Sequence, residues 1–334
     1  MADFYETGPA APVVESIRVD KVSPRSRWQG KVRAAAVIVL ALIGLIPIYV
    51  MGVTAFKTRT DVVAVPPKIT FSPTLEGFVF LFTERAVVTS SRMEEVKKAA
   101  EAGQLSLFQR IALNSGQQIT GTSDYVRRLK NSLIIAGLST LFSVTLGLFA
   151  AYAFSRFEVK GKDDLMFFIL STRMLPAVVV TIPIFLMYRQ LGLHDTHLGM
   201  ILLYTVFNLS LSVWLLKGFI DEIPREYEDA ALVDGYTRMQ AFFKIVLPQA
   251  VTGIAATTVF CLIFAWNEYA FALMLTSDTA RTAPPSIATM LGRGGIEWSA
   301  IAAGSLGFLI PVVIVAFALR NYLLRGVTFG AIRQ

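Results

Sequence analysis

The stretch Ile223–Pro248 reads IPREYEDAALVDGYTRMQAFFKIVLP and separates two long apolar blocks. Pro224 suits the start of a helix, and the acidic residues that follow complement the positive end of the helix dipole. Gly235 ends that helix, and Thr237 with Gln240, three residues later, forms a capping pattern that starts another. The stretch therefore predicts a helix, a glycine turn and a second helix between the two apolar blocks.

Apolar blocks of similar length make up much of the remaining chain. Of 334 residues, 54% are hydrophobic and only 16% are charged, whereas a soluble domain carries about a quarter charged residues. A helix needs roughly 17 to 25 apolar residues to cross a bilayer. Six blocks qualify, and they run over residues 34–56, 132–154, 165–188, 198–216, 250–275 and 301–319. We expect an all-α integral membrane protein with six spans, the third kinked or broken by Pro176 and Pro183.

Basic residues in the short connections set the expected orientation. They gather before the first span, after the second, after the fourth and after the sixth. Because positive charge marks the cytoplasmic side, both termini and Ile223–Pro248 are expected there. The predicted divisions are a cytoplasmic tail (1–33), a first transmembrane helix (34–56) and an external loop with short helices (57–130). A core of five transmembrane helices with a loop at 221–248 (131–324) and a second cytoplasmic tail (325–334) follow.

The long external loop contains its own helical signals. Ser91–Glu94 is a capping-box pattern, and Gly103 is placed to end the helix that follows. A second short helix would carry Leu105, Phe108 and Ile111. The loop is either a cap over helix ends or a docking surface for a partner, since long ordered insertions are often functional.

A fixed spacing runs through Ile223–Pro248. Asp229-Ala230-Ala231 is followed after three residues by Gly235, and after nine more by Ile245-Val246-Leu247-Pro248. This resembles the signature loop of permease subunits of bacterial ABC importers, which reads Glu-Ala-Ala, three residues, Gly, nine residues, Ile, any residue, Leu-Pro. Asp229 stands where that family usually has Glu, so the charge is kept and its reach is shorter.

The resemblance extends from about Tyr125 to the C-terminus. Asn131-Ser132-Leu133, Trp266-Asn267-Glu268 and Arg325-Gly326-Val327-Thr328 look like the carbohydrate branch of the family, which includes maltose-type permeases. Residues 85–122 look like an insertion relative to shorter relatives. The implied fold is a six-helix type I ABC importer permease with a cytoplasmic coupling helix in the bacterial inner membrane.

The resemblance also implies a division of labour. The chain would import a sugar or a sugar derivative, such as a glycoside or polyol, together with a second homologous permease, an ATPase homodimer and an extracytoplasmic solute-binding protein. The implied contacts to the ATPase are Glu226, Glu228, Asp229, Ala230, Ala231, Asp234 and Gly235. The alternatives are a self-contained secondary transporter or channel, whose inverted repeats are not detected here, and a membrane assembly subunit.

No enzymatic chemistry is recognisable in the sequence. No phosphate-binding loop is present, so ATP and Mg are expected on the partner ATPase and no cofactor on this chain. His194-Asp195-Thr196-His197 is interpreted as a polar turn, because two histidines are too few for a zinc site. The basic excess flanks apolar blocks, which argues against nucleic-acid binding.

Two ionisable residues fall inside predicted spans, where a charge is costly and usually functional. At 1.5 Å per residue, Arg173 lies about 12 Å along the third span and Glu268 about 27 Å along the fifth, too different in depth to predict an ion pair. Glu268, with Trp266 and Asn267 on the same helical turn, is a candidate for the sugar path, and Asn208 is a weaker one. The alternative for Glu268 is hydrogen bonding between the two permeases.

Overall fold

A computed structural model describes residues 24–88, 105–292 and 295–331. The chain divides into two units, residues 1–50 and 51–334. The predicted N-terminal tail as far as residue 23 and the helix expected between Ser91 and Gly103 lie outside the described residues.

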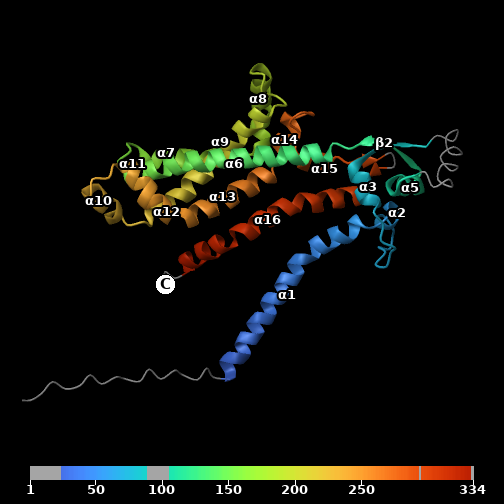
Figure 1. Cartoon of the computed structure of the whole chain (residues 1–334), viewed down its shortest axis with the longest axis horizontal. Helices are drawn as coiled ribbons and strands as arrows, with labels where there is room; N and C mark the ends of the chain where they lie inside the picture. The colour runs from blue at the N-terminus through green and yellow to red at the C-terminus, as the bar shows by residue number, and fades with distance from the viewer. Residues whose placement is uncertain (1–23, 89–104, 293–294, 332–334) are drawn as a thin grey trace, which may run out of the picture. The chain divides into compact units, whose positions relative to one another are not determined.

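The described residues are mostly helical (Figure 1). The helices are α1 Pro24–Ala55, α2 Arg59–Val62, α3 Glu76–Phe82, α5 Leu107–Asn114, α6 Tyr125–Arg156, α7 Lys162–Ser171, α8 Ala177–Gln190, α9 His197–Asp221, α10 Glu226–Val233, α11 Arg238–Ala241, α12 Leu247–Gln249, α13 Val251–Trp266, α14 Ala270–Leu275, α15 Ala283–Ala288 and α16 Trp298–Ala331. A 3-10 turn at Thr172–Met174 follows α7, and a π-helical turn at Phe242–Val246 follows α11. Two antiparallel strand pairs complete the list: β1 Thr83–Val87 with β2 Gln117–Thr122, and β3 Leu291–Gly292 with β4 Gly295–Ile296.

Within the described residues, four helices are long and apolar enough to cross a bilayer. They are Gly30–Ala55, Tyr125–Arg156, His197–Asp221 and Trp298–Arg320. Two bent helix pairs bring the number to six, the number predicted, if each pair counts as one span.

The third predicted span is broken, as its prolines suggested. Lys162–Met174 and Ala177–Gln190 meet at 93°. Pro176 is the N-cap of α8, whereas Pro183 lies inside α8. The break therefore falls where proline prevents the preceding residue from continuing a helix.

The fifth span differs from the prediction of one helix over 250–275. A 74° bend separates Arg238–Gln249 from α13, and α13 ends at Trp266. Asn267, Glu268 and Tyr269 then separate it from α14. The prediction of one continuous helix was wrong. The interruption at Asn267–Tyr269 contains neither proline nor glycine, and the Glu268 side chain caps the helix that follows it.

Helices α6 and α9 form the centre of the 51–334 unit, with α13 packed against both (Figure 1). Their close approach depends on Gly147 in α6, where a Cβ atom would lie 2.4 Å from the Oγ atom of Ser212 in α9. Ile135 of α6, Met200 of α9 and Leu275 of α14 are fully or almost fully buried in one core cluster. Helix α8 projects from the side of this centre.

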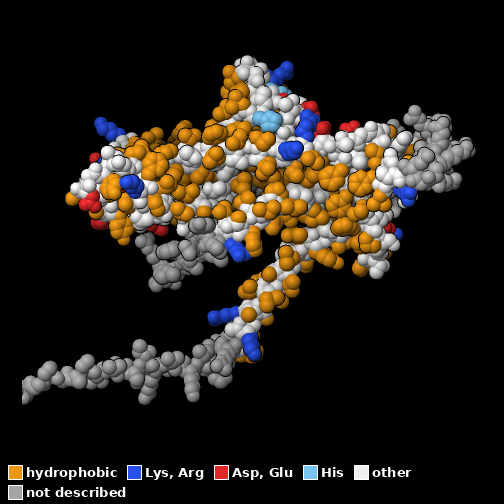
Figure 2. All heavy atoms as spheres, viewed as in Figure 1, with side chains coloured by type: hydrophobic (Ala, Val, Ile, Leu, Met, Phe, Trp, Pro, Cys, Tyr) orange, Lys and Arg blue, Asp and Glu red, His pale blue; other side chains and the backbone are white. Residues whose placement is uncertain are grey.

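The two ends of α6 carry different structures. At its C-terminal end, Arg156 contacts α10, and at its N-terminal end, Asn131 contacts the loop before α15. Helix α3, part of the predicted external loop, packs on α16, where a Cβ atom on Gly77 would lie 2.6 Å from the Ser299 carbonyl oxygen. The loop also contains the β1–β2 pair, which the sequence did not predict. In the 51–334 unit, hydrophobic side chains cover much of the visible flank of the long helices (Figure 2).

Candidate functional site

The segment Ile223–Pro248 folds as its sequence predicts. Helix α10 begins at Glu226, and Gly235 takes a positive φ of 87° that reverses the chain. Thr237 and Gln240 then form a complete capping box at the start of α11, each side chain bonding the other residue's backbone N–H. We call α10, the Gly235 turn and α11 the coupling loop.

One acidic residue fastens the coupling loop to α6. Glu228 is 4% exposed and accepts hydrogen bonds from the Arg156 guanidinium and, at 2.8 Å, from the Tyr152 hydroxyl. Arg156 also donates to the Ile223 carbonyl oxygen at 2.9 Å. Arg225 donates to the carbonyl oxygen of Ser155 at 2.7 Å. An arginine on each side of the junction between α6 and the coupling loop therefore donates to a carbonyl oxygen on the other side. The base of the loop is therefore tied to the end of a long membrane helix.

The remaining predicted ATPase contacts divide by orientation. Ala231 and Glu228 are the buried residues of α10. The other five, which are Glu226, Asp229, Ala230, Asp234 and Gly235, are exposed. Val233, 88% exposed, and Met239, 57% exposed, add apolar surface beside them. The exposed side combines carboxylates with apolar side chains, and Glu228 is turned away from it.

A second feature is a cavity of about 280 Å³ beside the breaks in the third and fifth spans. Arg173, next to the first break, and Glu268, within the second, both line it. The sequence did not predict that these two residues share a cavity, because each predicted span was treated as one straight helix. Within the described residues no ion pair joins them, and Asn208 lines the same cavity.

Glu268 organises the start of α14. Its carboxylate accepts hydrogen bonds from the backbone N–H groups of Phe271 at 2.8 Å and Ala272 at 3.0 Å. The Tyr204 hydroxyl donates to it at 2.6 Å. A carboxylate at a helix N-terminus satisfies free N–H groups and complements the dipole.

The other pathway candidates lie differently. Trp266 donates from Nε1 to the Phe308 carbonyl oxygen at 3.2 Å, and its ring stacks on Phe308. Asn267 donates to the Ile263 carbonyl oxygen at 2.9 Å. Neither lines the cavity. Tyr204 does, and sequence reasoning missed it, because a tyrosine in an apolar block is not distinguished from a packing residue.

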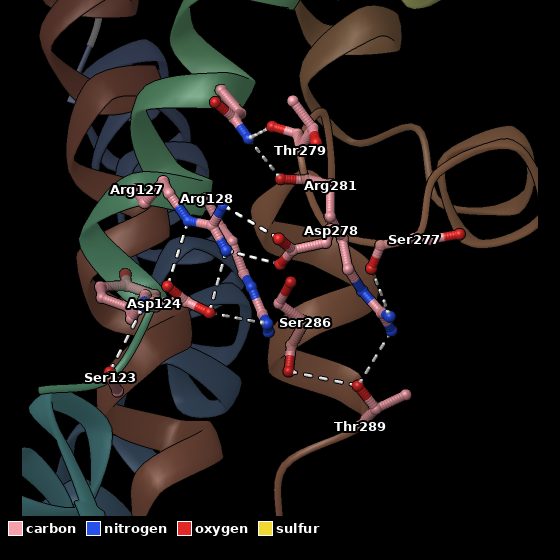
Figure 3. Close-up of polar contacts among 12 residues, drawn as sticks. Ser123, Asp124, Arg127, Arg128, Ser277, Asp278, Thr279, Arg281, Ser286 and Thr289 are labelled. Atoms are coloured by element: carbon pink, nitrogen blue, oxygen red, sulfur yellow. Dashed lines mark hydrogen bonds and ion pairs between the residues drawn. The ribbon is translucent and has the colours of Figure 1, made fainter. Parts of the chain in front are cut away.

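Polar contacts hold the loop between α14 and α15 at the opposite end of α6 (Figure 3). Arg127, in the first turn of α6, bonds both carboxylate oxygens of Asp278, and this contact lowers the pKa of Asp278. Asn131 donates to the carbonyl oxygens of Thr279 and Arg281. The loop is therefore fixed to α6.

The Asp195 carboxylate holds the same loop from another side. It accepts hydrogen bonds from four consecutive backbone N–H groups, from Ser277 to Ala280, at 3.0–3.2 Å. Asp195 itself has a positive φ of 55°. Its neighbour Thr196 caps α9, and His197 bonds the Asn131 side-chain oxygen at 2.9 Å. The predicted polar turn is thus a structural tie between two loops.

Comparison with known proteins identifies the family. Residues 143–329 match the family described as "Binding-protein-dependent transport system inner membrane component". The chain is 36% identical over 207 residues to the trehalose/maltose transport system permease protein MalG of Thermococcus litoralis, covering 61% of this chain and 74% of that one. It is 29% identical over 295 residues to the probable ABC transporter permease protein y4oR of Sinorhizobium fredii, covering 88% and 92%.

The fold is also shared with a solved transporter. A bacterial ABC transporter involved in the import of the acidic polysaccharide alginate superimposes with a TM-score of 0.60 at 20% identity, covering 90% of this chain and 98% of that chain. The family match spans the coupling loop and all the residues that line the cavity. The chain belongs to the family of binding-protein-dependent transport system inner membrane components, and it is a multi-pass inner-membrane permease of an ABC importer, a transport subunit and not an enzyme.

Proposed function

We propose that this permease imports a sugar or sugar derivative and that its coupling loop docks on an ATPase subunit. The observation that supports this most is the division of α10 into two sides. Glu228 and Ala231 face the membrane helices, whereas Asp229, Ala230 and Val233 are exposed. A loop fixed at its base and exposed along its outer side can transmit a displacement to α6, because buried ion pairs and packed helices move together.

The remaining assembly is proposed from the family resemblance. A second homologous permease completes the path, an ATPase homodimer supplies ATP and Mg binding, and an extracytoplasmic binding protein delivers the solute. Both termini then lie in the cytoplasm with the coupling loop. The positions of the coupling loop and the 277–280 loop at opposite ends of α6 are consistent with this orientation.

The sugar class is supported by relatives. The mycobacterial relative SugB is named a trehalose transport system permease, and it is 38% identical over 208 residues, covering 61% of this chain and 76% of that one. The cavity beside α9 combines phenylalanine rings with an arginine, a tyrosine, an asparagine and a glutamate. A largely apolar pocket with a few polar groups is the usual form of a small-molecule site. We propose that Asn208 and Glu268 belong to the path through this cavity.

Site-directed cross-linking tests the docking. Val233→Cys, in a Cys261→Ser background, should form a cross-link to the ATPase with a short bifunctional thiol reagent. Ala231→Cys is the matched control, two residues away on the same helix and facing inward, and it should not react. Cross-linking from position 231 but not 233, in an assembled complex, would contradict the proposed contact side.

Binding measurements test the substrate class. The partner binding protein should bind trehalose, maltose or a related glycoside or polyol in calorimetric titration, and the reconstituted importer should accumulate the same compound. Uptake of a non-sugar solute with no sugar bound would overturn the sugar proposal, while leaving the family membership unchanged.

A further inference from the structure

The cavity beside α9 contains four polar side chains whose hydrogen bonds can be accounted for one by one. Three donors occupy the Glu268 carboxylate, which has about four acceptor positions. The Tyr204 hydroxyl proton is used on Glu268. The Asn208 amide donates to the Cys261 carbonyl oxygen at 3.1 Å. These three side chains each form at least one hydrogen bond that holds α9, α13 and α14 together.

Arg173 is engaged least. Its guanidinium has five N–H donors, and one nitrogen, Nη1, reaches the Phe207 carbonyl oxygen at 3.3 Å. Within the described residues no carboxylate lies within ion-pair distance of it. Among the residues that the structure describes, its other N–H groups have no hydrogen-bond acceptor, and it lies in a chain region where an unpaired charge is costly.

The position of this guanidinium is nevertheless defined. Its Cζ atom lies 4.3 Å from the centre of the Phe264 ring, a distance typical of a cation–π contact. The Phe207 carbonyl oxygen accepts a hydrogen bond from the same guanidinium. A planar, stacked guanidinium loses little further freedom when it forms hydrogen bonds, so the side chain is prepared for a ligand rich in oxygen atoms.

We infer that Arg173 is a specificity-determining residue of transport, whose guanidinium donates hydrogen bonds to oxygen atoms of the sugar in the cavity. Glu268 and Tyr204 are positioning residues that fix the break between α13 and α14 around that site. The inference rests on the proposed sugar transport. A cavity of about 280 Å³ lies just below the usual range for small-molecule sites, so it suits one ring of a sugar such as trehalose or maltose.

Direct binding to the assembled complex tests this role. The purified permease–ATPase complex, with its binding protein, is held with ATP and vanadate, and retained tritiated trehalose or maltose is counted, whichever the binding protein binds. Arg173→Met keeps a long apolar side chain without donors and should weaken retention by about ten- to a hundredfold, the range for charge-assisted hydrogen bonds. Arg173→Lys keeps the charge without the planar fork and should give an intermediate loss.

Two controls separate binding from structure. Arg189→Met removes another arginine stacked on a phenylalanine, Phe185, of the same span, and it should retain sugar as the wild type does. Subunit ratio and unfolding temperature are measured for each variant. If Arg173→Met does not assemble, the comparison of Arg173→Lys with wild type decides.

Each result has one meaning. Wild-type retention in both assembled Arg173 variants overturns the inference and leaves sugar transport standing. Loss of the second permease from the Arg173→Lys complex shows that Arg173 acts in assembly and not in sugar binding, and this also overturns it. No retention by the wild type of a sugar that its binding protein binds would overturn the proposed cavity path itself.

Discussion

Arg156, at the end of α6, and Glu228, in α10, form a buried ion pair in which each side chain is 5% exposed. The pair joins a membrane-spanning helix to the coupling loop, and Tyr152 completes it with a hydrogen bond to the free carboxylate oxygen. Removing one member of such a pair leaves an uncompensated buried charge. The connection between the loop and the membrane helices therefore depends on these two residues.

Glu228→Gln should destabilise this junction. The amide keeps the shape but leaves Arg156 without its counter-charge, a loss of about 3 to 5 kcal/mol in buried pairs. Thermal unfolding of the purified complex measures the loss, and sugar uptake should fall with it. Glu226→Gln, an exposed change on the same helix, is the control and should alter stability by less than about 0.5 kcal/mol. Equal unfolding temperatures for the two variants would contradict the anchoring role.

Gly235 should be required for its backbone conformation alone. Its φ is 87°, and a Cβ atom added there would meet nothing within 4 Å. Gly235→Ala should therefore cost about 1 to 2 kcal/mol by strain and reduce uptake, whereas Gly235→Asn should be milder, because asparagine tolerates positive φ. The ratio of sugar transported to ATP hydrolysed checks this. If alanine and asparagine proved equally damaging in assembled complexes, side-chain space at the ATPase contact would matter instead.

Asp195 should make the tie to the 277–280 loop sensitive to acid. Partial burial raises the pKa of its carboxyl group, but the backbone N–H donors of residues 277–280 outweigh burial and leave the pKa below its usual 3.8. Because the pKa is lower in the folded state, the carboxylate stabilises the fold at pH values above its unfolded-state pKa, near 3.9. This stabilisation is lost as the pH falls through the folded-state pKa.

Asp195→Asn removes this effect. At pH 7 the variant should unfold at a lower temperature, by the equivalent of about 1.5 to 3 kcal/mol for charge-assisted hydrogen bonds. The difference from wild type should shrink as the pH is lowered below about 4. A difference that stayed constant from pH 7 to pH 3 would show that the carboxylate charge is not what holds the loop.

The sequence predicted the features that depend on residues close together in the chain. The apolar blocks gave the number of spans, Pro176 gave the first break, and Gly235 with Thr237 gave the turn and second helix of the coupling loop. Features that depend on tertiary contacts were not predictable. Glu226, Glu228 and Asp229 look alike in sequence, and only the position of Arg156 turns Glu228 inward.

The cavity shows the same limit. The break at Asn267–Tyr269 contains no helix-breaking residue, so the fifth span was predicted as one helix and the cavity that Glu268 shares with Arg173 was not predicted. Trp266 and Glu268 were grouped because they are neighbours in sequence. Their side chains separate at the helix end, one toward Phe308 and the other toward Tyr204.

Thiol labelling should show that the coupling loop is cytoplasmic and that the 277–280 loop is external. Cys261 is buried, so Cys261→Ser provides a background for single cysteines at Tyr236, on the coupling loop, and Ser277, on the opposite loop. Both positions are exposed. An impermeant maleimide applied to intact spheroplasts should label position 277 only, with position 236 reacting after permeabilisation. The reverse pattern would invert the proposed topology.

ATP-dependent uptake by the reconstituted importer tests the central claim most directly. Proteoliposomes containing both permeases and the ATPases are given the binding protein and tritiated sugar on one side, and ATP on the side of the coupling loop. The account predicts accumulation that requires ATP and the binding protein, and that is unaffected by ionophores that collapse ion gradients. Accumulation without ATP that an ion gradient drives and an ionophore abolishes would contradict it, because the chain would then act as a secondary transporter.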